Sequence, residues 1–506
     1  MLNKKMRLAI TFVLLVLLLV TCVFIIAKYI DWLWIIGVVT ISFGTLTALI
    51  IFVSNRPART KISWIIAVYA LPIVGIVIFI IFGRTYRYTK AQKFYLKKYQ
   101  DFYAKEDFNY TNNFLKNQIK EERSILHLTT NISQRPLYNH TKVDLITNGI
   151  EKFSLLFKDL ESAENYIHIN YFILDDGEVL KYLTQLLIKK TYQGVNIRLI
   201  YDHAGSFFTV YHDTIQKLKR AGVHLKRFSP INLPFISGRN NYRNHRKDVI
   251  IDGKIGYTGG INVGDAYCHL SSKYGFWRDS QVRLQGSAVR SLELIFLQDW
   301  YFTTGESLVF DKKLLKNEPY DGKTSNIVQV IDDGPNTYET IQKDIYVKVI
   351  SSAKSRIWLS TPYFIPTDDI VTALKNAAKS GVDVRLLMPG KTDKFFILDI
   401  SRSYYDELFN SGIKIYEMSK IFNHSKTALI DDNLVIIGST NLDFRSLYHD
   451  HQTIVILYGD ANKQLEKNYL WDIERSILLT TSPLKKKNWF YRIMILPIVK
   501  IFDPLF

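Results

Sequence analysis

Cysteine is nearly absent from this chain. The 506 residues include only Cys22 and Cys268, and Cys22 lies in an apolar run, which argues against a disulfide framework. Neither an H-E-x-x-H motif nor paired C-x-x-C spacings occur, so the usual zinc-binding patterns are missing as well. We therefore expect a site that uses no metal and no cofactor.

Acidic residues are fewer than basic ones. The chain carries 65 Lys and Arg against 47 Asp and Glu, a formal net charge of +18. An excess of this size favours anionic partners, either a phospholipid surface or a nucleic acid.

Long apolar runs are plentiful near the N-terminus. Three stretches carry no charged residue: Leu8 to Ala27, Trp32 to Val53 and Ile62 to Phe82. Each is long enough to cross a hydrocarbon core of about 30 Å. The first follows basic residues as a signal peptide would, but its apolar core is too long and no small-x-small cleavage site follows, so we predict an anchor. Pro72 and Gly75 make a bent or re-entrant helix the alternative for the third stretch.

The basic residues around these runs bear on topology. Lys4, Lys5 and Arg7 favour a cytoplasmic N-terminus, and Arg56, Arg59 and Lys61 favour a cytoplasmic second loop. A further basic group follows Phe82 and also favours the cytoplasmic side; it comprises Arg84, Arg87, Lys90, Lys93, Lys97 and Lys98. Three full spans would place that group outside, so two spans and three spans both stay open.

One pattern occurs twice, once near the middle of the sequence and once toward its C-terminal end. Both copies fit H-x-K-x4-D-x6-G-x2-N, and the second follows the first by 179 positions. The first copy supplies His245, Lys247, Asp252, Gly259 and Asn262; the second supplies His424, Lys426, Asp431, Gly438 and Asn441. Two other H-x-K triplets, at His140 and His224, lack the Asp five residues after the Lys. Solvated surface hairpins would not explain five residues repeated in register.

The spacing predicts a hairpin with its reactive groups on one face. Short apolar runs flank Asp252 and Asp431, as expected for two strands joined by a tight turn. Because residues two apart on a strand share a face, each His and its Lys point the same way. One imidazole can attack the phosphorus of a phosphodiester while the other protonates the leaving alkoxide. The two lysines and two asparagines can then donate to the phosphoryl oxygens.

The duplicated motif resembles that of the phospholipase D superfamily. Four sequence segments in and around the motif most resemble those of the bacterial cardiolipin synthases: NYRNHRK at 241–247, GGIN at 259–262, WRD at 277–279 and GSTNLDFRS at 438–446. The resemblance runs from about Ile62 to the C-terminus. It implies an α/β fold of two pseudo-symmetric phospholipase D-like halves, each a mixed sheet with flanking helices, after N-terminal transmembrane helices. One active site would lie between the halves.

The resemblance also implies roles for single residues. His245 would be the nucleophile and His424 the acid, with Lys247 and Lys426 beside them. Asp252 and Asp431 would fix the motif geometry. Asp279 would orient His245, and Gln452, which stands where the superfamily has a Glu, would accept a hydrogen bond from His424. The predicted substrate-binding residues are Asn262, Asn441, Gly259 and Ser439.

Further repeats extend the duplication. Residues 166–174, 194–199 and 222–228 correspond to 357–365, 381–386 and 412–418, in both halves as apolar strand patterns between helical ones. The first half holds 11 extra residues before His245, predicted as a loop. We predict five parts: a membrane anchor at 1–83 with two or three transmembrane helices, a linker along the membrane surface at 84–135, the halves at 136–318 and 319–482, and an interfacial segment at 483–506. For the last part, a final helix packed on the catalytic region is an equal alternative.

The function expected from this resemblance is cardiolipin synthesis. Two phosphatidylglycerol molecules would give cardiolipin and glycerol through a phosphohistidine intermediate, in a multi-pass protein of the bacterial cell membrane. A membrane-bound phospholipase D-type hydrolase or another phosphatidyltransferase is the alternative. The expected partners are phosphatidylglycerol and anionic lipids, without nucleic acid; no oligomeric state is predicted. A non-catalytic polyanion-binding protein would suit the charge, but the intact paired motifs argue against it.

Overall fold

The computed structural model describes residue 21 and residues 33–83, 89–116, 120–231, 241–270, 275–308, 311, 313–316, 318–335, 340–394 and 396–503. The apolar run from Leu8 to Ala27, apart from Thr21, lies outside the described residues, as do Arg84, Arg87 and most of the predicted loop before His245. The chain forms two compact units. Unit 1 comprises residues 1–86, 229–241 and 501–506, and unit 2 comprises residues 87–228 and 242–500.

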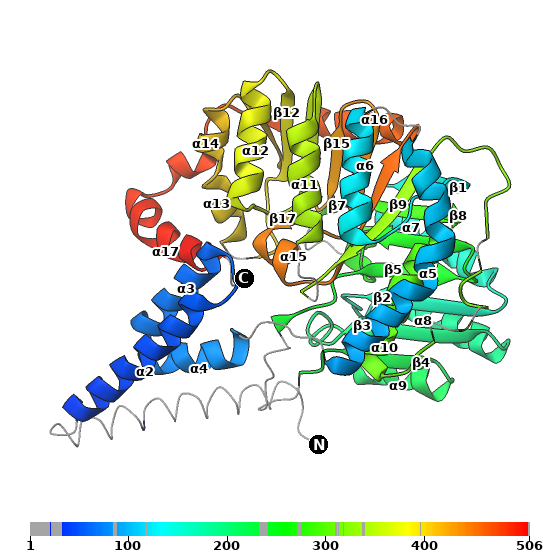
Figure 1. Cartoon of the computed structure of the whole chain (residues 1–506), viewed down its shortest axis with the longest axis horizontal. Coiled ribbons are helices and arrows are strands. Elements are labelled where there is room, and N and C mark those ends of the chain that lie inside the picture. The colour runs from blue at the N-terminus through cyan, green and yellow to red at the C-terminus, as the bar shows by residue number, and fades with distance from the viewer. Residues whose placement is uncertain are drawn as a thin grey trace. The chain divides into compact units, whose positions relative to one another are not determined.

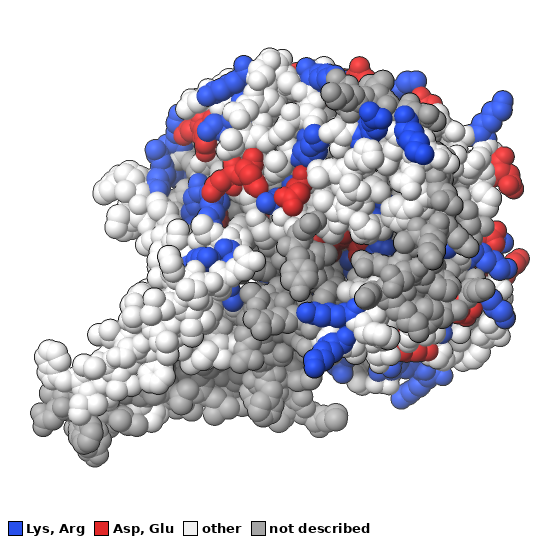
Figure 2. All heavy atoms as spheres, in the orientation of Figure 1, with Lys and Arg blue, Asp and Glu red and all other residues white. Residues whose placement is uncertain are grey.

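Unit 1 contains three apolar helices, α2 (Leu33–Val53), α3 (Ala58–Ala70) and α4 (Pro72–Phe82). The backbone breaks at Leu71, because the residue before a proline is disfavoured in the helical region. The third apolar run is therefore two helices joined at Leu71, as in the bent-helix alternative, and the number of membrane spans stays a prediction. Of the described helices, the one covering Trp34–Val53 is long and apolar enough to cross a membrane. The described surface over these helices shows almost no charged side chains (Figure 2).

Unit 2 contains two sheets built to one plan (Figure 1). The first has the order β1-β8-β6-β5-β2-β3-β4 and the second β9-β18-β16-β15-β10-β12-β13, with β19 added at its far edge. In each sheet three neighbouring strands run parallel, and the motif hairpin continues the sheet antiparallel to them. The mixed sheets and all three repeats beyond the motifs are confirmed.

The strands of the first sheet are β1 (Thr141–Ile146), β2 (Tyr166–Tyr171), β3 (Asn196–Asp202), β4 (His224–Phe228), β5 (Lys247–Ile251), β6 (Ile255–Gly259) and β8 (Gln281–Gly286). Those of the second are β9 (Ile327–Asp333), β10 (Arg356–Ser360), β12 (Asp383–Pro389), β13 (Lys414–Met418), β15 (Thr427–Ile430), β16 (Leu434–Gly438), β18 (Gln452–Tyr458) and β19 (Ile477–Leu479). Four short strands form two small pairs, β7 (Phe276–Arg278) with β14 (Ile421–Asn423) and β11 (Phe364–Ile365) with β17 (Leu442–Asp443).

Helices cover the sheets in matching positions. In the first half they are α7 (Gly149–Glu161), α8 (Glu178–Tyr192), α9 (His212–Arg220), the 3-10 turn η3 (Asp265–Cys268) and α10 (Val289–Thr304). In the second half they are α11 (Ile341–Ser352), α12 (Asp368–Lys379), α13 (Ile397–Arg402), α14 (Tyr405–Phe409), α15 (Phe444–Tyr448) and α16 (Ala461–Glu474). Each half has its own buried apolar cluster, and a third cluster draws on both sheets together with α10 and α16. This shared core holds the two motifs in one rigid frame.

Two helices precede the first half, α5 (Lys90–Lys116) and α6 (Lys120–Ser133). Leu115 and Leu126 are buried in the cluster of the second half, and α6 lies beside α11 (Figure 1). The stretch predicted as a linker thus contributes side chains to the core of unit 2.

The C-terminal segment continues through η4 (Pro483–Lys486), a π-helical turn η5 (Tyr491–Ile495) and α17 (Leu496–Ile501). Leu484 and Leu496 are buried in the second half's cluster, and the Tyr491 hydroxyl donates to Asp399 at 2.7 Å. Six of its large apolar side chains are exposed: Trp489, Phe490, Ile493, Met494, Ile495 and Ile498. The segment is therefore packed on one side and leaves an apolar face on the other.

Candidate active site between the two halves

Each motif Asp lies at the turn of its hairpin. Asp252 and Asp431 adopt positive φ angles of 53° and 49°, which Asp tolerates better than most residues. Asp252 accepts backbone N–H groups of Glu164, Asn165 and Tyr166 at 2.7 to 2.8 Å. Asp431 accepts those of 354–356 in the same way, at 2.8 to 3.1 Å. These hydrogen bonds tie each turn to the start of the neighbouring strand, β2 or β10, and the role of the two carboxylates in fixing the motif geometry stays a prediction.

The motif glycines allow neighbouring strands to approach closely. A Cβ at Gly259 would lie 2.5 Å from the Ser280 carbonyl oxygen, and one at Gly438 would meet the Thr453 carbonyl in the same manner. Such contacts are sterically forbidden, so any side chain here would push the hairpin away from β8 or β18. A direct contact of Gly259 with substrate stays a prediction.

Two cross-connections bring the histidines of different halves together. Strand β14 runs parallel to β7, and the backbone N–H of His424 donates to the Arg278 carbonyl at 2.7 Å. An isolated parallel bridge joins Asn244 to His451, and the N–H of His245 donates to the His451 carbonyl at 2.9 Å. Because Asp279 follows Arg278, the first connection places His424 beside Asp279. Because Gln452 follows His451, the second places His245 beside Gln452.

The partners of the two histidines are crossed relative to the prediction. Nδ1 of His424 lies 2.7 Å from Oδ2 of Asp279, whereas Nδ1 of His245 lies 3.1 Å from Oε1 of Gln452. The prediction that Asp279 orients His245 and Gln452 contacts His424 is wrong. It assumed that each orienting residue serves the motif of its own half, but the two strand pairings join the halves to each other.

Both imidazoles are kept neutral by their surroundings, to different degrees. Burial first, then Lys247 and Lys426, hold the pKa of His245 well below its ordinary value, and the neutral Gln452 opposes this only through its hydrogen bond. Burial and Lys426 also lower the pKa of His424, but Asp279 opposes them with a full negative charge. Burial alone would raise the pKa of Asp279; Lys426 and His424 outweigh it, so Asp279 stays ionised. Of the two histidines, His424 is therefore the one whose partner favours the protonated form, although its pKa stays below the ordinary value.

The motif lysines are fully buried cations beside the histidines. Lys247 Nζ donates to the His245 carbonyl and lies 5.2 Å from the centre of the Phe172 ring. Lys426 Nζ lies 2.7 Å from Nδ1 of His424. Burial lowers the pKa of both, that of Lys426 to about 8. An anion bound between them would favour their charged forms, which suits a phosphate site.

Three of the predicted substrate-binding residues form hydrogen bonds within the protein. Asn262 accepts from the Ile173 N–H at 3.1 Å and donates to the Tyr267 hydroxyl at 2.9 Å. Asn441 donates to Asp443 at 3.1 Å. Ser439 donates to Oε1 of Gln452 at 2.6 Å and so holds the amide that faces His245. Direct contacts of these residues with substrate stay predictions.

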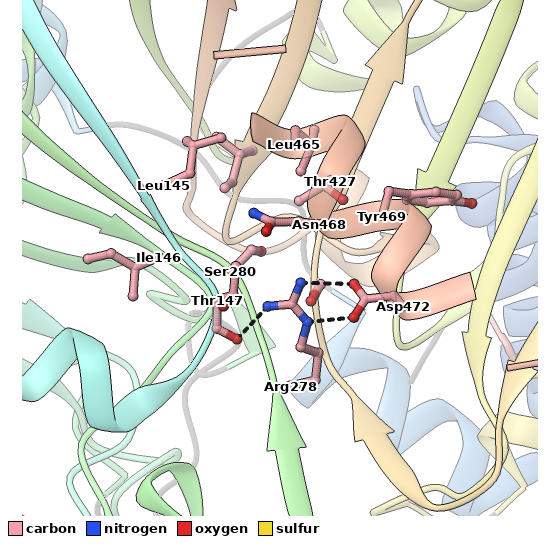
Figure 3. A pocket seen from close by; sticks show the side chains of 12 residues that line it. Leu145, Ile146, Thr147, Arg278, Ser280, Thr427, Leu465, Asn468, Tyr469 and Asp472 are labelled. Atoms are coloured by element: carbon pink, nitrogen blue, oxygen red, sulfur yellow. Dashed lines mark hydrogen bonds and ion pairs between the residues drawn. The ribbon is translucent and has the colours of Figure 1, made fainter. Parts of the chain in front are cut away.

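Sequence reasoning missed two ion pairs that join the halves. Arg278 forms a bidentate pair with Asp472 of α16, at 2.7 and 3.0 Å, and also donates to the Thr147 carbonyl (Figure 3). These side chains border a cavity of about 20 Å³, enough for one water molecule. The only sequence signal was the position of Arg278 beside Asp279.

The second missed pair centres on Arg246, within the first motif. Its guanidinium is fully buried and pairs with Asp299 of α10 at 2.6 Å and with Asp332 of β9 at 3.5 Å. In the second motif the same position is Ser425. The two motifs are therefore supported differently although their reactive residues match.

Among the residues that the structure describes, no three His, Cys, Asp or Glu side chains are grouped as ligands of a metal ion. The metal-free mechanism stays a prediction. The donors gathered at this site are imidazoles and ammonium groups, a set suited to a phosphate anion.

Comparisons with known proteins agree with this arrangement. The family described as "Cardiolipin synthase, PLD-like domain" matches residues 156–300 and 346–473, and "Phospholipase D-nuclease N-terminal" matches residues 45–84. The cardiolipin synthase of Geobacillus sp. (strain WCH70) is 40% identical over 434 residues, covering 85% of this chain and 86% of its own. That of Alkalihalophilus pseudofirmus is 34% identical over 470 residues, covering 91% and 92%. The crystal structure of phosphatidylserine synthase from Haemophilus influenzae covers 75% of this chain and 99% of its own with a TM-score of 0.56; at 14% identity this is a likeness of fold.

Proposed function

Because the chain belongs to the family of cardiolipin synthases with phospholipase D-like domains, we infer that it transfers a phosphatidyl group from one phosphatidylglycerol to another, giving cardiolipin and glycerol. It is a phosphatidyltransferase that acts on phospholipids. The observation that carries the mechanism is the unequal pair of histidines: His245 faces the neutral Gln452, and His424 faces the carboxylate of Asp279.

In the first step His245 is the nucleophile. Its Nδ1–H donates to Gln452, which leaves Nε2 with a free lone pair. Nε2 attacks the phosphorus of the donor lipid, a P–N bond forms, and the P–O bond to the glycerol headgroup breaks. His424 gives its proton to the departing oxygen, so glycerol leaves neutral. Lys247 and Lys426 stabilise the charge on the phosphoryl oxygens.

In the second step the roles of the groups reverse. His424, now neutral, takes the proton of a hydroxyl on the second phosphatidylglycerol, whose oxygen attacks the phosphorus. The P–N bond breaks, His245 returns to its neutral state, and cardiolipin forms. Burial of His424, Lys247 and Lys426 favours a lipid hydroxyl over water as the acceptor.

Membrane attachment places the site near its substrates. The chain associates with the membrane through its N-terminal apolar helix, and we propose further attachment through the first apolar run and the exposed face of the C-terminal segment. A multi-pass anchor within residues 1–83 remains part of this proposal, as do the boundaries of the linker and the two halves.

The test uses the purified full chain in mixed micelles with labelled phosphatidylglycerol as the only phospholipid. We expect labelled cardiolipin and glycerol in equal amounts. Phosphatidic acid as the main product would overturn the transferase and establish a phospholipase D-type hydrolase instead.

A further inference from the structure

The two halves differ at the loops that follow their middle parallel strands, β3 and β12. In the first half, residues 203–211 carry no Lys or Arg and include the exposed Phe208. In the second half, residues 390–396 carry Lys391 and Lys394, both exposed. The loop after β12 is therefore basic, whereas the matching loop after β3 carries no Lys or Arg; we call residues 390–396 the rim of the second half.

Lys394 is held close to the reactive centre. Its Nζ lies 4.6 Å from the centre of the Tyr363 ring, and that ring lies 6.0 Å from the ring of His424. The Tyr363 hydroxyl donates to Asp393 at 2.6 Å, and Thr392 forms hydrogen bonds with the backbone of Lys394 at 3.0 and 3.1 Å. The turn thus fixes the backbone of Lys394, and the ammonium group lies over a ring that is in contact with His424. After burial and the two motif lysines, Lys394 is a further cause that lowers the pKa of His245, in the opposite half.

The phosphate that reacts does not require this third cation. A phosphodiester carries one negative charge, and the buried Lys247 and Lys426 already lie beside the histidines. In the first half the loop after β3, which the structure describes in full, carries no such cation, and Phe172, the counterpart of Tyr363, has the catalytic Lys247 over its ring. An exposed cation at only one of these two matching loops favours a second anion, bound on that side.

The proposed reaction supplies such an anion. When the acceptor is phosphatidylglycerol, the attacking hydroxyl and the acceptor's own phosphate belong to one glycerol. In the product that glycerol joins two phosphorus atoms six bonds apart, roughly 7 Å when extended. The ammonium group of Lys394 is separated from His424 by the Tyr363 ring. This separation is comparable to the distance between the two phosphorus atoms, so Lys394 can reach the second phosphate while the first lies at the histidines.

We propose that Lys394 binds the phosphate of the acceptor phosphatidylglycerol and so selects an anionic lipid over a neutral alcohol. This inference rests on the proposed function. It assigns the donor lipid to the motif lysines and the acceptor lipid to the rim of the second half.

The test is a competition between two acceptors. The full chain is given labelled phosphatidylglycerol in mixed micelles with ethanol, so that cardiolipin and phosphatidylethanol form from the same phosphohistidine. In Lys394→Met the ratio of cardiolipin to phosphatidylethanol should fall about tenfold, as for the loss of one charge-assisted hydrogen bond. Lys394→Arg should keep the ratio within about twofold of the wild type, and Lys394→Glu should lower it further.

Lys391→Met is the matched control, because Lys391 is an exposed lysine of the same loop. A similar fall in Lys391→Met would mean that the general charge of the rim attracts lipid, and it would overturn the assignment to Lys394. An unchanged ratio in Lys394→Met would do the same. If the wild type makes phosphatidylethanol but no cardiolipin, the proposed function fails, which is distinct from both of these results.

Discussion

Asp279 of the first half holds His424 of the second, with 2.7 Å between Oδ2 and Nδ1. The same carboxylate accepts the Ser280 N–H at 2.8 Å and the Trp277 indole N–H at 3.3 Å, so its orientation is set from its own half. The proton of His424 is thus controlled by a charge that the other half supplies. Neither half could hold both histidines in their working states alone.

Replacing Asp279 with Asn should weaken the acid. Asn keeps the size of the side chain but removes the charge that raises the pKa of His424 against burial and Lys426. The pKa of His424 should fall, and the acid form should be lost at a lower pH. The alkaline limb of the pH–rate profile should therefore move to lower pH, with kcat reduced by roughly 10²-fold. An unmoved alkaline limb would show that His424 does not supply the proton.

Replacing Gln452 with Glu should change the acidic limb of the pH–rate profile. A carboxylate 3.1 Å from Nδ1 would raise the pKa of His245, which burial and the motif lysines now hold low. Because the nucleophile must be neutral, activity should be lost earlier as the pH falls. The acidic limb should move to higher pH while the alkaline limb stays. A shift of the alkaline limb alone would mean that His245 is the acid, and the two roles would have to be exchanged.

Turnover should require both histidines. His245→Ala and His424→Ala should each lower cardiolipin formation by several orders of magnitude, since nucleophile and acid act as one unit. The matched control is His224→Ala, which alters an exposed histidine that also begins an H-x-K triplet. Its rate should stay near that of the wild type. If either motif variant kept most of its activity, a single shared site would be ruled out.

The internal repeat predicts much of the fold. Residues 166–174 and 357–365 gave matching central strands because both are apolar β-type runs followed by similar helices. The hairpin role of Asp252 and Asp431 also followed from the sequence, since turn residues have local causes. Such features depend on neighbours along the chain.

The crossing of the histidine partners could not be predicted in this way. It depends on β7 pairing with β14 and on Asn244 pairing with His451, contacts between segments more than a hundred residues apart. The same holds for Arg278 with Asp472, and for Lys394, which lies in a loop outside every repeat. Residues that join the halves belong to no repeated sequence pattern, so the repeat could not predict their contacts.

Removal of metal ions should leave the chemical step intact. The positive charge at the phosphate comes from Lys247 and Lys426, for which a chelator has no affinity. The rate of cardiolipin formation in EDTA should equal that in buffer when total ionic strength is matched. Loss of activity that one divalent ion alone restores would contradict the mechanism, whereas equal recovery with several cations would reflect lipid packing.

Replacing Asp431 with Asn should lower the stability of the fold more than it lowers the rate of the reaction. Burial alone would raise its pKa, but the N–H groups of Ser355, Arg356 and Lys354 outweigh burial and lower it. A folded-state pKa below the unfolded value contributes stability above pH ~4, and this is lost as the pH falls through the folded pKa. Asp431→Asn tolerates the positive φ but weakens these hydrogen bonds, so the unfolding midpoint in detergent at pH 7 should drop by roughly 1 to 3 °C. The difference in midpoint between the wild type and Asp431→Asn should narrow below pH 4.

Asp432→Asn is the neighbouring control, because that side chain is 87% exposed and pairs only at the surface with Arg356. If Asp431→Asn instead lost several orders of magnitude in kcat at a temperature where it stays folded, the carboxylate would have to take part in the reaction.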